Sequence, residues 1–236
     1  MLDSTKLVSA LDKALRELGP RVRGKEWADW SMRTHHMKGN AVRETTSRKA
    51  VPHKKEYVLA RALERLGYHR YQKGVQHQTH VFFHEWRQLD IGVVECDNNW
   101  ADDCWMGKYT TRLVLEVEND IREFTMTMRG MLDVRAELYC GIFYSDKPRI
   151  EEIEVGSGTK EDPPVLIRDW PLPWKQTTSG ATLPAGSSVM ALFLSSSEPA
   201  VRGWKEWTSG AKDESHVSES SLEFWDNGAD RVWDGA

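Results

Sequence analysis

The sequence predicts an α/β protein built on one mixed sheet, and three of its patterns support this prediction. Residues 113–117 form an apolar run of aliphatic and β-branched side chains, which is typical of a buried strand. Residues 121–132 repeat apolar side chains at helical spacing, and residues 136–144 form a second buried strand. Strand, helix and strand in this order indicate a βαβ crossover, so we expect the two strands to pair in parallel.

The chain is long enough for one well-packed core with extensions, and its charge is unevenly distributed. It has 236 residues and a net charge of −4. Residues 1–55 hold 13 Lys and Arg against 6 Asp and Glu, whereas residues 113–236 hold 12 against 22. The basic amino-terminal part favours a polyanionic partner, and a solvated basic surface is the equally weighted alternative.

Cysteine content and hydropathy indicate a soluble, cytoplasmic protein. Cys96, Cys104 and Cys140 include no CxxC pair and leave one cysteine over, so we expect free thiols. A zinc site at Cys96 and Cys104 is an alternative, but its spacing is unlike the common zinc patterns. No apolar run approaches the ~18 residues of a membrane span, and the amino terminus lacks a secretory signal. We therefore expect no membrane partner.

Two helices are predicted before the sheet begins. Residues 2–18 carry leucines at spacings of three and four, with Asp3 or Ser4 as the amino-terminal cap. Residues 53–67 carry a second apolar stripe, with Glu56 in the first turn. The positive end of the helix dipole favours an acid at that position.

Residues 20–55 are basic and aromatic, and their apolar periodicity is weak. Their cations are interleaved with Trp27, Trp30 and three histidines. Such a segment suits an arm that faces nucleic acid, with cations on phosphates and tryptophans stacked on bases. A loosely ordered linker anchored by the two tryptophans is the alternative. The cations that we assign to phosphate contact are Arg43, Arg48, Lys49, Lys54 and Lys55.

The sheet is predicted to begin with a β-hairpin. Residues 76–83 and 86–94 are strand-like runs separated by the polar pair His84-Glu85. Residues 95–111 are rich in Asp and Asn and predict a solvated acidic loop without EF-hand spacing.

After residue 145 the apolar periodicity weakens. One more strand is predicted at 188–194, and an acidic, poorly ordered tail from about residue 208.

The central strand also carries charge. Glu116 and Glu118 are two residues apart, so they project from one face, whereas the aliphatic residues beside them project from the other. Two neighbouring acids repel each other, and we therefore expect a cation between them. Asp90, in the apolar run 89–94, adds a third hard oxygen donor from a second strand.

The order of helix, hairpin with an Asp, strand with Glu-x-Glu, helix and strand resembles the PD-(D/E)xK nuclease superfamily, which has the restriction-endonuclease-like fold. The resemblance covers roughly residues 53–146 and depends on Asp90, Glu116 and Glu118. Leu89 stands in the place of the motif's Pro, and Glu118 stands in the place of its Lys. The usual water-orienting cation is therefore missing, although some restriction enzymes of this superfamily also carry Glu there.

This resemblance implies hydrolysis of phosphodiester bonds with Mg²⁺ or Mn²⁺. Asp90, Glu116 and the backbone carbonyl of Val117 would bind the ion, because Mg²⁺ takes one or two carboxylates together with water and substrate phosphate. The ion would polarise the phosphate and lower the pKa of a bound water. Glu118 would orient that water, act as general base or hold a second ion.

The resemblance also supplies auxiliary residues and a division of the chain. Glu56 matches the place of an additional acid in some members, and Arg122 or Arg129 would contact the phosphate. The division is an N-terminal helix and basic arm at 1–52, a nuclease-like core at 53–146, a C-terminal extension of the core at 147–207 and an acidic, flexible tail at 208–236.

Taken together, these patterns predict a metal-dependent nuclease that favours DNA over RNA. One alternative is a catalytically idle nucleic-acid-binding module of the same fold, and another is a structural core with a stray acidic cluster. Many nucleases of this fold act as dimers, so a homodimer is an option that the sequence leaves open.

Overall fold

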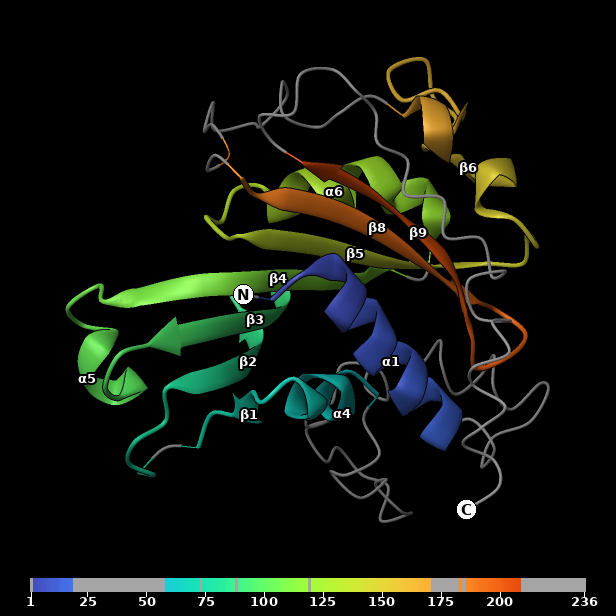
Figure 1. Ribbon diagram of the computed structural model, residues 1–236. Coiled ribbons are helices and arrows are strands. Elements are labelled where there is room, and N and C mark those ends of the chain that lie inside the picture. Colours follow the sequence, from blue (N-terminus) through green and yellow to red (C-terminus); the bar gives the residue numbers. More distant parts are fainter. Residues whose placement is uncertain are drawn as a thin grey trace, which may run out of the picture.

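A seven-stranded mixed sheet is the centre of the molecule (Figure 1). The computed structural model describes residues 2–18, 58–72, 74–87, 89–118, 120–170, 183 and 186–208. In sheet order the strands are β1 (His69–Arg70), β2 (His80–Trp86), β3 (Leu89–Cys96), β4 (Tyr109–Glu118), β5 (Leu138–Ser145), β8 (Ser188–Ser195) and β9 (Val201–Thr208). β3 and β9 run antiparallel to the other five. The protein therefore has a mixed α/β fold, as the sequence predicts.

The predicted βαβ crossover is confirmed, because β4 and β5 pair in parallel with a helix between them. The helical segment has two parts, a 3-10 turn at Ile121–Glu123 and helix α6 at Phe124–Met131. Asp120 begins the turn, since its carboxylate accepts a hydrogen bond from the backbone N–H of Arg122 at 3.0 Å. This side chain satisfies one of the unpaired donors at the start of the segment.

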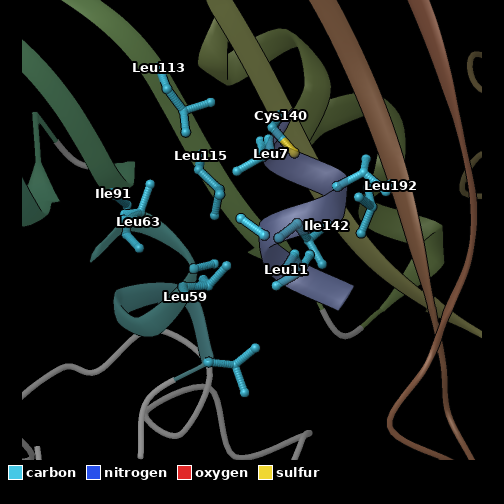
Figure 2. Close-up of a cluster of buried hydrophobic side chains, with 14 of the residues drawn as sticks. Leu7, Leu11, Leu59, Leu63, Ile91, Leu113, Leu115, Cys140, Ile142 and Leu192 are labelled. Atoms are coloured by element: carbon cyan, nitrogen blue, oxygen red, sulfur yellow. The ribbon is translucent and has the colours of Figure 1, made fainter. Parts of the chain in front are cut away.

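Two helices cover one face of the sheet. They are α1 (Ser4–Leu18) and α4 (Val58–Arg65), and their leucines meet the aliphatic side chains of β3, β4, β5 and β8 (Figure 2). The Asp3 carboxylate accepts from the backbone N–H of Lys6 at 2.8 Å and so caps α1, as predicted. No helix in the described ranges is long and apolar enough to cross a membrane.

The other face is covered by α6 and by the segment that follows β5. This segment contains the 3-10 turns η4 (Ile150–Glu152) and η5 (Ile167–Asp169) and a two-stranded sheet of β6 (Glu154–Val155) and β7 (Val165–Leu166). Aromatic rings fill the interface: Phe124 on α6 lies 4.6 Å from Phe143 and 5.0 Å from Trp170, between ring centroids. The centre of the sheet is therefore buried on both faces.

Two local predictions on the hairpin side were wrong. β2 does not end at His84-Glu85, because its pairing with β3 continues to Trp86 opposite Leu89. The predicted loop at 95–111 contains a one-turn helix, α5 (Trp100–Asp103). This turn forms because the buried ring of Trp100 packs between Phe83 and Tyr109, at centroid distances of 4.8 and 5.1 Å.

Strand β9 was not predicted, and it forms one edge of the described sheet. Its inward-facing positions include Lys205, which is only 6% exposed. The Lys205 ammonium donates to the carbonyl oxygens of Ile167 and Arg168, at 3.1 and 2.6 Å, and lies 5.3 Å from the Trp207 ring centroid. Burial lowers the pKa of this ammonium. A buried cation thus connects the edge strand to η5.

Gly141 is required where β5 passes under α6. A Cβ atom at this position would lie 2.6 Å from the Met128 sulfur and 2.7 Å from a ring carbon of Phe143. Real Cβ contacts are essentially never this short, so the missing side chain allows α6 to pack closely on β5 beside β4.

We predict that Gly141→Ala lowers the free energy of unfolding by about 1–3 kcal/mol, because the added methyl group overpacks this interface. Gly130→Ala is the matched control. Gly130 is an exposed residue in α6 where a Cβ meets no atom within 4 Å, so this change should stabilise the protein by up to about 1 kcal/mol. Urea unfolding of both variants measures the difference, and equal stability would contradict the proposed close packing.

Candidate active site

The carboxyl end of β4 carries the two predicted acids on one face. Leu113, Leu115 and Val117 belong to the core beneath α1 and α4, whereas Val114 belongs to the core beneath α6. Because side chains alternate along a strand, Glu116 and Glu118 project on the α6 side. Both are partly exposed, unlike Val117 between them. The predicted alternation is confirmed.

Asp90 lies beside this pair at the start of β3. The Asp90 carboxylate accepts a hydrogen bond from the backbone N–H of Val117 at 2.8 Å. Val117 lies between Glu116 and Glu118 on β4. The structure therefore brings the Asp90 carboxylate to the stretch of β4 that carries both glutamates.

Glu118 is held by the turn that follows it. One of its carboxylate oxygens accepts from the backbone N–H of Asp120 at 2.9 Å. Asp120 in turn accepts from the Arg122 guanidinium at 2.6 Å, and these hydrogen bonds lower the pKa of Asp120 to about 2. Sequence reasoning missed Asp120, although an Asp directly before a helical segment is a recognised capping signal.

The two auxiliary arginines lie in different surroundings. Arg122 is 72% exposed and is paired with Asp120 near the end of β4. Arg129 is in the last turn of α6 and lies near Asp162. Burial alone would raise the pKa of Asp162, but hydrogen bonds from Ser157 and Thr125, together with the charge of Arg129, lower it. Contact of either arginine with a phosphate stays a prediction.

Other predicted residues lie outside the described ranges. Glu56 precedes the first described residue of α4. The predicted phosphate-contacting cations all belong to the part of the chain between residues 19 and 57, and are Arg43, Arg48, Lys49, Lys54 and Lys55. Their roles stay predictions.

The donor chemistry of this end of the sheet suits Mg²⁺ or Mn²⁺, which prefer carboxylate oxygens. Among the described residues, however, no group of three or more His, Cys, Asp or Glu side chains is arranged to hold a metal ion. Asp90 and Glu118 each use an oxygen to accept a backbone N–H. Mg²⁺ commonly takes only one or two carboxylates and completes its shell with water and substrate. A water-rich site at Asp90 and Glu116 therefore stays a prediction.

A second polar cluster, which the sequence did not reveal, lies near the amino ends of β4 and β5. The Arg112 guanidinium donates to Glu95 at 2.7 Å and also to Glu137, and the Tyr68 hydroxyl donates to Glu95 at 2.6 Å. Burial and the Glu95 carboxylate both raise the pKa of Tyr68. In the sequence, this cluster is marked only by charged residues at the borders of apolar runs. Such residues are common at strand ends, so they do not by themselves indicate a cluster.

No protein-family model, curated protein or solved structure matches this chain. Its function is therefore inferred from its own residues and their geometry.

We predict different stabilities for two substitutions of Asp90. Asp90→Ala removes the acceptor of the buried Val117 N–H and should cost about 1–3 kcal/mol in the free energy of unfolding. Asp90→Asn keeps a carbonyl oxygen and should cost clearly less. Asp97→Ala, at an exposed position after β3, should stay within about 0.5 kcal/mol of the parent. If Asp90→Ala unfolds in urea like Asp97→Ala, the hydrogen bond contributes nothing to stability.

Proposed function

We propose that this chain is a metal-dependent nuclease that hydrolyses phosphodiester bonds and favours DNA over RNA. The observation that supports the proposal most is the hydrogen bond from the Val117 N–H to Asp90, which brings a third carboxylate to the partly exposed end of the strand that carries Glu116 and Glu118. Acids are rare in strands that are covered on both faces, and their placement at the strand end leaves them accessible to a substrate.

The order of elements supports a restriction-endonuclease-like core. Along the chain come α4, the β2–β3 hairpin with Asp90, β4 with Glu116 and Glu118, then α6 and β5. This is the order on which the resemblance to the PD-(D/E)xK superfamily depends. We include this finer fold assignment, with residues 53–146 as the nuclease-like core, in the proposal.

In the proposed mechanism the side chains at the end of β4 have separate roles. Asp90 and Glu116 would hold the divalent ion, which supplies polarisation of the scissile phosphate and activation of water. Glu118 accepts the proton of the attacking water, because it is the remaining carboxylate on this face. The Asp120 N–H fixes one Glu118 oxygen and leaves the other to act as the base. Arg122, which is exposed at this end, is the nearest candidate to offset phosphate charge.

The basic amino-terminal arm would supply affinity for the polyanion. Cations that neutralise phosphates release counterions, so this contribution does not depend on base sequence. The DNA preference belongs to the same proposal, and the cleavage assay with DNA and RNA tests it.

The second candidate function is a nucleic-acid-binding module without catalysis. Two observations favour it: Glu118 replaces the family's Lys, and Asp90 has a structural bond to Val117. Binding of plasmid DNA without cleavage under Mg²⁺ and Mn²⁺ would select this candidate over the enzyme.

We predict that Glu118→Ala lowers the cleavage rate on the order of a hundredfold or more, because the general base is removed. Its melting temperature should stay close to that of the parent, since the lost hydrogen bond from the Asp120 N–H is offset by the loss of one of two like charges on the same face. The assay uses plasmid, linear single-stranded DNA and RNA, each with Mg²⁺, Mn²⁺ or EDTA. Glu154→Ala, on the exposed side of β6, is the control and should cut like the parent. A Glu118→Ala protein as fast as the parent would refute the assigned role.

We also predict that Mn²⁺ raises the melting temperature of the parent, because an ion that binds only the native state stabilises it by mass action. The increment should disappear in Asp90→Asn, a variant that keeps the acceptor for Val117. Calorimetry with and without Mn²⁺ measures both. An equal increment in parent and variant would place the ion elsewhere.

A further inference from the structure

The loop between β3 and β4 carries the most exposed large apolar side chain of the described residues. Trp105 is 89% exposed, and Met106 beside it is 57% exposed. Tryptophan rings are largely buried in folded proteins, so a ring that lies almost wholly in solvent indicates a contact surface. The loop follows α5 at the amino end of β4, and about 30 Å of strand separates that end from Glu118 (Figure 1).

The turn that presents this ring is held in place by a buried acid. The Asp103 carboxylate accepts from the backbone N–H of Asn98 at 2.9 Å. The Asp103 carbonyl oxygen accepts from the backbone N–H groups of Met106 and Lys108, at 3.2 and 3.0 Å. The loop is therefore ordered before a partner binds, which lowers the entropic cost of a contact through Trp105.

Three exposed cations belong to this end of the sheet. Lys108 follows the ring in the same loop. Arg87 and Arg135 line the cavity between the amino ends of β4 and β5, to which Gly107 of the loop also belongs. A Cβ atom built at Gly107 would meet no other atom within 4 Å, so this part of the loop is open. A polyanion can therefore reach the ring and the cations together.

Acids are also present at this end, but those of the cavity already have a donor within the protein. The pairs are Glu137 with Arg112, Asp3 with Lys6, and Glu206 with the Ser4 hydroxyl. The exposed acids of the loop, Asp97 and Asp102, come before the ring in the chain, whereas Lys108 comes after it. Phosphates are therefore expected on the Lys108 side of Trp105.

A nucleic acid accounts for the ring and the cations together. A base stacks on an aromatic face whatever its sequence, and the neighbouring phosphates attract Lys and Arg. A protein partner that covered the ring with an apolar surface would also cover nearby cations, and burying an unpaired charge is costly. Within a continuous duplex each base face is covered by the next base pair. The ring therefore requires an unpaired base.

We propose that Trp105 stacks on an unpaired base and that Lys108 contacts an adjoining phosphate, so that the chain takes nucleic acid with a single-stranded stretch. This inference rests on the proposed nuclease function and names its substrate class. Because the ring is about 30 Å or more from the acids at the carboxyl end of β4, it contributes to binding and not to the chemical step.

The test is fluorescence anisotropy of a labelled oligothymidylate of about 20 nucleotides, which is long enough to reach both ends of β4. It is titrated with the full chain in EDTA. Trp105→Ala should weaken binding about 5- to 100-fold, the range for one stacked base, and Trp105→Phe should retain part of the affinity. Met126→Ala, at a 67% exposed position of α6, is the matched control and should bind like the parent.

A blunt duplex of the same length exposes base faces only at its ends, so Trp105→Ala should leave duplex affinity nearly unchanged. Lys108→Ala should reduce the salt dependence of oligothymidylate binding by about 0.7 log unit per log unit of salt, the value for one phosphate of a single strand. Lys160→Ala, exposed in the loop between β6 and β7, should keep the parental slope.

Trp105→Ala should melt like the parent, because the ring is almost wholly in solvent. No binding of oligothymidylate by the parent, or parental affinity in the folded Trp105→Ala variant, would overturn the proposal. An equal loss of duplex affinity would overturn the assignment to an unpaired base. Since binding is measured without metal or cleavage, an inactive protein whose binding depends on Trp105 would refute the catalytic proposal alone.

Discussion

The burial of β4 on both faces is the constraint that decides where polar chemistry can lie in this molecule. Helices α1 and α4 cover one face and α6 covers the other, so the middle of the strand is restricted to apolar side chains. Charged groups are tolerated only at its two ends. The acids Glu116 and Glu118 occupy the carboxyl end, and Arg112 lies near the amino end. Both polar regions of the protein follow from this one arrangement.

Neighbouring acids repel each other, and this repulsion is compensated differently at the two ends of β4. Near the amino end, a protein guanidinium lies between Glu95 and Glu137 and compensates both acids in part. At the carboxyl end, the nearby guanidinium of Arg122 is paired with Asp120. In the proposed function, a divalent ion supplies the compensation there.

Local sequence patterns were sufficient to predict the parts of the fold that depend on a single pattern. The alternation along 113–117 predicted which way Glu116 and Glu118 project, and the helical spacing after it predicted the parallel crossover. Strand β9 was missed because Lys205 occupies an inward position, where a polar residue breaks the expected alternation. The bond from the Val117 N–H to Asp90 was beyond prediction, since it depends on how two separate strands meet.

The buried Lys205 has a consequence for how this protein behaves at high concentration. An edge strand offers unpaired backbone groups to any other chain, and an inward-pointing charge is one of the devices that natural sheets use against such pairing. Here the ammonium is already committed to two carbonyl oxygens of η5, so it cannot turn outward without losing both. A strand added beside β9 would have to extend the sheet past a charged position. Lys205 thus protects this edge against edge-to-edge aggregation while it holds the small β6–β7 layer against the sheet.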